Sequence, residues 1–189
     1  ALGADSGAVG TTAVAGNAGN VAVGHNTISK GLNTVTLGRD LAANGAQSAA
    51  IGSSSSASGQ FALAIGTGYA GGNPATPGSY GANASGDSSI AIGRSTQATA
   101  TGATAIGGQS EASGAGSLAL GSNNNGFGAK ATGEKAIAVG AAATASGARS
   151  IVVGVNSSAT GNDTQAIGNS ASVSSNYGTA LGTFAKVES

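Results

Sequence analysis

Very few side chains in this sequence could carry out acid–base or metal chemistry. The 189 residues contain one histidine, His25, and no cysteine. Serine is abundant, but His25 is the one candidate general base for a Ser-His-acid triad, and it directly follows Gly24 in an expected turn. Neither a second histidine nor a cysteine is present to complete a metal site around it. The sequence therefore predicts no catalytic residues, no cofactor and no metal, and we expect a protein that is not an enzyme.

The charge and glycine content argue against nucleic-acid and nucleotide partners. Seven basic and seven acidic residues give a net charge of zero, and the basic residues form no patch, which argues against a nucleic acid as partner. G-x-G fragments such as residues 66–68 are expected by chance among 35 glycines, and none of them opens a helix. We therefore expect no phosphate-binding loop.

Two segments carry aromatic and amide side chains suited to contact a protein partner. Residues 67–80 contain both prolines and two of the three tyrosines, and residues 122–128 contain three consecutive asparagines and a phenylalanine. Tyrosine offers a large contact area with few rotatable bonds. The candidate partner-binding residues are Tyr69, Asn73, Pro74, Pro77, Tyr80, Asn123, Asn124, Asn125 and Phe127. The alternative is that both segments are merely tolerated surface loops, because extending such a loop costs little free energy.

A 14-residue repeat must position these segments. Twelve glycines mark it, at positions 10, 24, 38, 52, 66, 93, 107, 121, 140, 154, 168 and 182, and nine of the eleven steps between them are 14 residues long. The two longer steps contain the two segments described above. The consensus is A-x-G-x-x-S-x-A-I-G followed by four variable residues. Self-similarity at a fixed period is the signature of a repeat architecture, so we expect one continuous domain over residues 1–189.

Each repeat has room for two short strands and two turns. No segment shows a 3.6-residue apolar stripe, and glycine interrupts the chain every few residues, so helices are not expected. The pattern predicts an all-β parallel solenoid in which each repeat is one rung and equivalent strands stack about 4.8 Å apart. Twelve rungs would extend roughly 55–60 Å at that spacing.

The S-x-A-I strand is apolar on both of its sides. A strand of this kind is typically buried on both sides, yet one side of it has nothing in the chain to cover it. We therefore expect copies of the chain to associate in parallel, and three copies about an axis is one natural closed solution. The expected core and trimer-interface ladder consists of Val9, Val23, Leu37, Ile51, Ile65, Ile92, Ile106, Leu120, Val139, Val153, Ile167 and Leu181.

The other strand of each rung alternates small residues with polar ones. Lys30, Glu111 and Lys130 alternate there with small residues that are expected to point inward. This strand is therefore expected to expose one side to water, and these three charged residues form a second candidate binding surface on its outer face.

The repeats resemble those of a known family. Residues 89–93 (SIAIG), 48–52 (SAAIG), 117–121 (SLALG) and 150–154 (SIVVG) are similar to the S-V-A-I-G repeat of YadA-like head domains, which belong to the trimeric autotransporter adhesins of Gram-negative bacteria. The resemblance implies a left-handed parallel β-roll that assembles as a parallel homotrimer. It also implies a head at the bacterial cell surface, held away from the outer membrane by a stalk and a C-terminal membrane anchor.

The resemblance further implies a non-catalytic role in attachment to the host. The implied partners are host matrix proteins such as collagen, fibronectin or laminin, or a host cell-surface receptor. Because the chain starts and stops inside the repeat, we expect it to be a fragment of a longer protein whose stalk and anchor lie elsewhere. The alternative is a purely structural spacer of an adhesin, with the receptor site in another part of the protein.

Overall fold

All regular elements in the described parts of the chain are β-strands. The computed structural model describes residues 2–68, 81–122 and 127–188. The chain forms a parallel β-solenoid of about 12 turns with rungs of about 14 residues, as the repeat predicted. It divides into two compact units, unit 1 over Ala1–Thr99 and unit 2 over Ala100–Ser189.

Each rung contains a first strand on the S-x-A-I segment, a first turn at the repeat glycine, a second strand and a second turn. In unit 1 the first strands are β1 (Gly7–Val9), β5 (Ala49–Ser53), β7 (Leu63–Thr67) and β9 (Ile90–Ile92). Its second strands are β2 (Val14–Ala15), β6 (Ser56–Ala57), β8 (Asn83–Ala84) and β10 (Gln97–Ala98). The longer strands β3 (Val21–Ser29) and β4 (Val35–Ala43) run through the first turn and supply both strands of their rungs.

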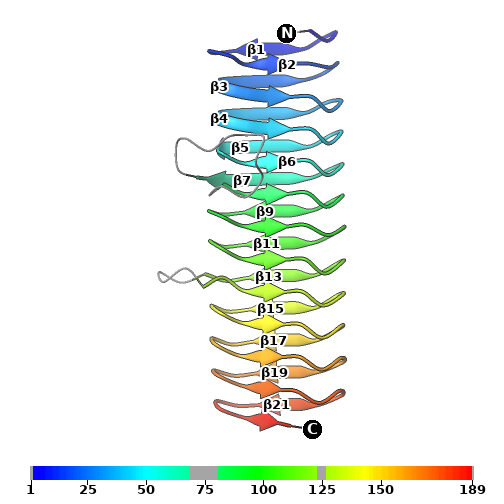
Figure 1. Ribbon diagram of the computed structural model, residues 1–189, viewed down its shortest axis with the longest axis vertical. Helices are drawn as coiled ribbons and strands as arrows, with labels where there is room; N and C mark the ends of the chain where they lie inside the picture. The colour runs from blue at the N-terminus through cyan, green and yellow to red at the C-terminus, as the bar shows by residue number, and fades with distance from the viewer. Residues whose placement is uncertain (1, 69–80, 123–126, 189) are drawn as a thin grey trace. The chain divides into compact units, whose positions relative to one another are not determined.

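Unit 2 repeats the same arrangement. Its first strands are β11 (Thr104–Ile106), β13 (Leu118–Leu120), β15 (Ile137–Val139), β17 (Ile151–Val153), β19 (Gln165–Ile167) and β21 (Thr179–Leu181). Its second strands are β12 (Glu111–Ala112), β14 (Lys130–Ala131), β16 (Thr144–Ala145), β18 (Ser158–Ala159), β20 (Ser172–Val173) and β22 (Lys186–Val187). Within each unit these strands follow one another as stacked rungs (Figure 1).

Equivalent strands pair in parallel, and the pairing register follows the repeat. Ile137 pairs with Ile151, 14 residues later. The two longer steps of the sequence do not disturb this register, because Ile65 pairs with Ile92 and Leu118 pairs with Ile137. The additional residues of both steps are therefore accommodated outside the paired strands.

The core of each unit consists mainly of alanine. The central residue of the first strands points inward and is fully buried, as Ala91 in unit 1 and Ala119 in unit 2 illustrate. Inward residues of the second strands, such as Ala57 and Ala145, are also fully buried. Among the described residues, Leu41, Val152 and Val173 are the largest apolar side chains that are fully buried. The interior between the strands is thus narrow, which explains how a chain poor in large apolar residues can fold.

Buried hydroxyl groups satisfy the backbone of the second turn. The serine of the S-x-A-I segment is buried in several rungs, and at Ser48 and Ser150 its hydroxyl donates a hydrogen bond to the carbonyl of the glycine three residues earlier. The oxygen–oxygen distance is 2.7 Å from Ser48 to Gly45 and 2.7 Å from Ser150 to Gly147. Because a buried carbonyl without a partner is unfavourable, this bond accounts for the serine in these two rungs, whereas the hydroxyls of Ser89 and Ser117 have no hydrogen-bond partner among the described residues.

The first turn requires glycine for two reasons. Gly38 has a φ of 138°, a backbone conformation that other residues rarely adopt. A Cβ atom added to Gly38 would also lie against the backbone carbonyl of Gly52 on the next rung. The repeat glycines therefore permit the rungs to stack closely at this edge.

Candidate functional site

The insertion of unit 1 leaves and rejoins the solenoid at the first turn. The backbone N–H of Gly68 donates to the carbonyl of Ser53 over 2.9 Å, and the Ser53 hydroxyl donates to the Gly68 carbonyl over 2.9 Å. At the other end, the Ala82 N–H donates to the Ser55 hydroxyl oxygen over 3.2 Å, and Gly81 is buried. Both ends of the insertion are thus held by residues 53–55 of the preceding rung.

The insertion of unit 2 also arises at a first turn. The Ala129 N–H donates to the Gly121 carbonyl over 3.2 Å, which closes the base of this insertion. Phe127 lies just before this base and is 61% exposed. The other candidate residues, Tyr69, Asn73, Pro74, Pro77, Tyr80, Asn123, Asn124 and Asn125, lie outside the described residues.

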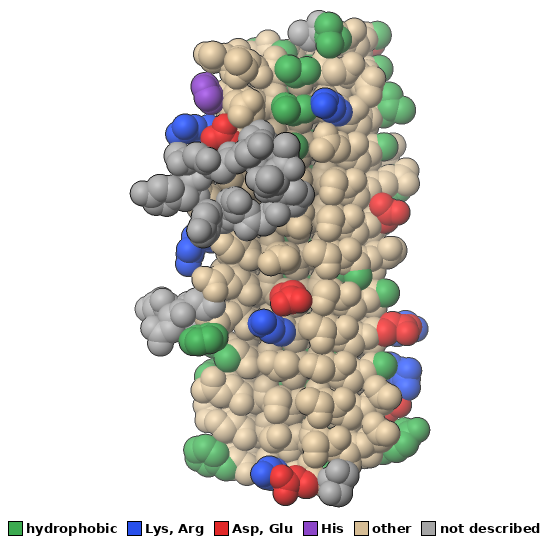
Figure 2. All heavy atoms as spheres, in the orientation of Figure 1, with side chains coloured by type: hydrophobic (Ala, Val, Ile, Leu, Met, Phe, Trp, Pro, Cys, Tyr) green, Lys and Arg blue, Asp and Glu red, His purple; other side chains and the backbone are tan. Residues whose placement is uncertain are grey.

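The charged candidates on or beside the second strands belong to both units. Glu111 on β12 and Lys130 on β14 occupy paired register positions, and their charged groups lie 3.6 Å apart. Lys30 is exposed directly after β3, in unit 1, and forms no ion pair with any described residue. In the space-filling view, most of the visible surface of both units is uncharged (Figure 2). The second-strand face therefore offers polar contacts with few charges.

The aliphatic ladder lies on the outer face of the first strands. Its twelve residues are half-buried or exposed, and Val9, Leu37 and Leu181 are 65%, 49% and 64% exposed. Our expectation that these residues also belong to the core is wrong. Strand alternation turns the neighbouring alanine inward and the aliphatic side chain outward, and the narrow interior is filled by that alanine.

A second outward row runs beside the ladder, two residues earlier on each first strand. In unit 1 it includes Val21, Val35 and Leu63, and in unit 2 it includes Leu118, Ile137 and Ile151. Together the two rows form a largely aliphatic face that no described residue of the same unit covers. Faces of this kind on soluble proteins commonly mark an interaction surface.

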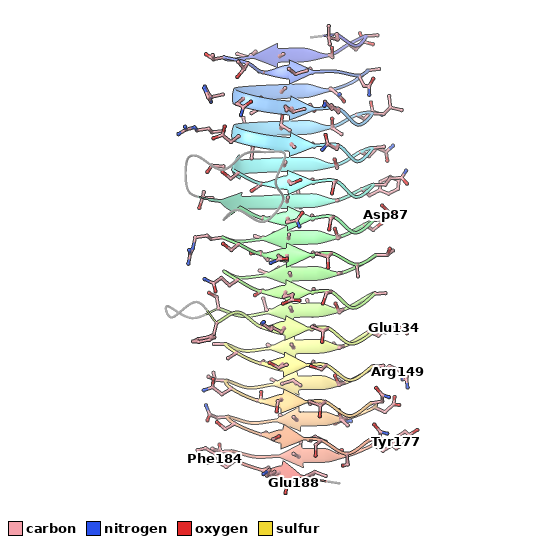
Figure 3. The ribbon with its side chains drawn as sticks, viewed as in Figure 1. Asp87, Glu134, Arg149, Tyr177, Phe184 and Glu188 are labelled. Atoms are coloured by element: carbon pink, nitrogen blue, oxygen red, sulfur yellow. The ribbon has the colours of Figure 1, made fainter. Side chains whose placement is uncertain are left out.

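Charged and aromatic side chains gather along the second-turn edge of unit 2. Figure 3 shows Glu134, Arg149 and Tyr177 along one edge of this unit, while Phe184 projects from the opposite edge. The Arg149 guanidinium binds the Asp163 carboxylate through two hydrogen bonds of 2.6 Å, so the pair joins successive rungs. Tyr177 follows one rung later and is 80% exposed.

Hydrogen bonds along this edge also shift the acid–base equilibria of its carboxyl groups. The hydrogen bonds from Arg149, supported by its positive charge, hold the pKa of Asp163 below its usual range. The Lys135 ammonium, 3.0 Å from the Glu134 carboxylate, lowers the pKa of Glu134 in the same way. This edge was not among the sites expected from the sequence, although the 14-residue spacing of Lys135, Arg149, Asp163 and Tyr177 contained the signal.

One charged side chain is unexpectedly buried. Asp40 lies in the first turn at 6% exposure, accepts a hydrogen bond of 2.9 Å from the Asn26 side-chain amide, and lies 3.2 Å from the Arg39 guanidinium. These partners compensate for the loss of hydration that burial imposes on a carboxylate. The burial of Asp40 is therefore explained by its contacts with Arg39 and with Asn26 on the neighbouring rung.

The described residues contain no group of three or more His, Cys, Asp or Glu side chains that could hold a metal ion. The same parts of the chain contain no helix long and apolar enough to span a membrane. What the arrangement presents is an aliphatic face, a polar face, and turn edges that carry charges and insertions.

The chain belongs to the YadA head domain repeat family. The family model matches residues 43–68, 80–96, 98–124, 131–157, 145–164 and 159–185, which together make up more than half of the chain. A comparison with curated proteins gives no match. The family is one of adhesins, so the resemblance carried by the S-x-A-I-G segments is confirmed, and the fold belongs to an adhesin-type head domain.

Proposed function

We propose that this protein is the head of a bacterial surface adhesin that attaches the cell to host extracellular matrix or to a host cell receptor. The observation that carries the proposal is the match of the head-repeat family over more than half of the chain. Collagen, fibronectin and laminin are the candidate matrix partners. The role is non-catalytic, and the protein acts at the bacterial cell surface, at the outer membrane.

We further propose that the working form is a left-handed β-roll assembled as a parallel homotrimer. The aliphatic rows on the first strands support this proposal, because residues such as Leu37 and Leu181 are exposed in a single copy. Packing these rows against identical copies would remove apolar surface from water. A trimer also presents each binding surface three times, which raises the avidity above the affinity of one site.

The insertions are the first candidates for the partner-binding site. Both arise at first turns, and the insertion of unit 1 is held at its base by Ser53 and Ser55. The test is to delete residues 69–80 while keeping Gly68 and Gly81, and to measure adhesion of the trimer to immobilised matrix proteins and host cells. Loss of adhesion with an unchanged circular dichroism spectrum would support this site, and unchanged adhesion would exclude it.

The polar face of the second strands is the second candidate. Reversing the charge of Lys30, Glu111 and Lys130 should change adhesion and its salt dependence if this face binds the partner. Glu111 and Lys130 should be reversed together, because the exchange keeps their ion pair. If neither the deletion nor the reversals change adhesion, the alternative function as a structural spacer is favoured.

A further inference from the structure

One of the two outward rows of unit 2 is aliphatic in every described rung. The residue before each first-turn glycine is aliphatic throughout the described rungs: Ile106, Leu120, Val139, Val153, Ile167 and Leu181. A copy displaced along the stack by one rung, about 4.8 Å, would again place aliphatic side chains against aliphatic side chains. This row brings copies together but specifies their register poorly.

Gln165 breaks the repetition in the neighbouring outward row. Leu118, Ile137 and Ile151 follow one another in register, and the next position in the row is Gln165 on β19. The Gln165 side chain is exposed, and it forms no hydrogen bond with any described residue. A polar amide without a partner among the described residues therefore lies directly beside Ile151 and two residues from Ile167, in a row whose other polar members are Thr104 and Thr179.

We propose that Gln165 sets the register of the parallel homotrimer by pairing its side-chain amide with the Gln165 amides of the other copies. This proposal rests on the homotrimer proposed above. A glutamine amide both donates and accepts hydrogen bonds, so identical residues at the same height satisfy one another. The outward rows of unit 2 carry no charged side chain in the described rungs, which favours an equally uncharged partner such as a second copy.

A displacement by one rung removes this pairing. In one direction Gln165 would face Ile151 of the neighbouring copy, which offers no side-chain donor or acceptor. In the other direction it would face Thr179. The single hydroxyl of Thr179 cannot replace both the donor and the acceptor of a second amide. A desolvated amide without partners is unfavourable, and a polar residue within an apolar interface is a known means of fixing register.

The test uses cysteine cross-linking, since the chain has no cysteine of its own. The variants Ile137→Cys and Ile151→Cys lie one rung apart in the same row. One of them carries a tag that separates it by size, and the two are refolded together and oxidised. Disulfides between equal positions report the correct register, and mixed 137–151 disulfides report a displacement by one rung.

With Gln165 present, we expect disulfides between equal positions to dominate. In a Gln165→Ile background, we expect the ratio of mixed 137–151 disulfides to disulfides between equal positions to rise about tenfold. This is the factor expected when the displaced arrangement no longer leaves an amide without a hydrogen-bond partner. Gln165→Asn keeps the amide and should retain the correct register. The control Gln97→Ile, on β10 of unit 1, exchanges the same residue types on the second-strand face and should leave the ratio unchanged.

The mass of the untreated protein in native buffer separates this proposal from the one on which it depends. A trimer whose disulfide ratio is unaffected by Gln165→Ile would overturn the register role of Gln165 and leave the homotrimer in place. A folded monomer of 17.3 kDa would overturn the homotrimer and, with it, the role of Gln165.

Discussion

At the scale of single residues, the turns are the most constrained part of each rung. Two residues after the first-turn glycine, and again in the second turn, the backbone adopts a left-handed conformation, with φ of 53° at Asp40 and 57° at Arg149. Charged and aromatic residues occupy such positions although glycine and asparagine are usually preferred there. At two of these positions the side chains form a contact along the stack, the Arg149–Asp163 ion pair.

We predict that Gly38→Ala lowers the free energy of unfolding by about 1–3 kcal/mol or more. A strained backbone conformation alone usually costs an amount in this range. The new Cβ would meet both an unfavourable φ and the Gly52 carbonyl. Gly7→Ala is the matched control, since a Cβ there meets no atom within 4 Å. Urea unfolding followed by circular dichroism measures both variants, and equal stability of the two would contradict this account of the turn.

The Asp163 carboxyl should titrate below the ordinary aspartate value of about 3.9, because Arg149 stabilises its charged form. The pKa in the folded state is lowered, so the contribution of this pair to stability is present above the unfolded pKa and is lost as the pH falls through the folded value. NMR titration of the carboxyl carbon measures the shift. Arg149→Gln should return the pKa toward the ordinary value, and Arg94→Gln, in unit 1, should leave it unchanged.

At the scale of the strand, alternation decides which residues face the interior. On β16, Thr144 points outward and is half-buried, whereas the next residue, Ala145, is fully buried. The second-strand alanines face the first-strand alanines across an interior too narrow for larger side chains in most rungs. Packing in such a core is sensitive to any added volume.

We predict that Ala145→Leu destabilises the protein by about 1–3 kcal/mol or more, because overpacking displaces the neighbouring strands. Thr144→Leu places the same side chain on the outer side of the same strand and should change stability by about 0.5 kcal/mol at most. Thermal unfolding distinguishes the two variants. A tolerated leucine at position 145 would show that the interior is less tightly packed than the structure indicates.

The sequence predicted the strands and turns well because the repeat glycines and the buried alanines recur at fixed positions. The prediction that the aliphatic residue before each glycine belongs to the core was wrong. Ala91 and Ile92 are both apolar, and only strand alternation decides that Ala91 points inward and Ile92 outward. The second-turn edge was missed because the contact between Arg149 and Asp163 joins residues one rung apart. Such contacts follow from the stacking of the rungs, which a single repeat does not contain.

At the scale of the whole molecule, the aliphatic rows favour association over an isolated chain. We predict that Ile151→Glu abolishes the proposed trimer and yields a folded species of 17.3 kDa in native mass measurement, because a charge in the apolar interface is costly to desolvate. Thr144→Glu, on the opposite face of unit 2, is the control and should leave the trimer intact. An intact trimer with glutamate at position 151 would place the interface elsewhere.

The way in which the unit 1 insertion is anchored has a practical consequence. Its base is fixed by Ser53 and Ser55 to one rung, and the pairing of Ile65 with Ile92 on either side of it is undisturbed. Extending a surface loop whose ends are held in this way costs little free energy. A foreign epitope cloned between Gly68 and Gly81 should be displayed without rebuilding the solenoid, which would make this chain a carrier for peptide presentation.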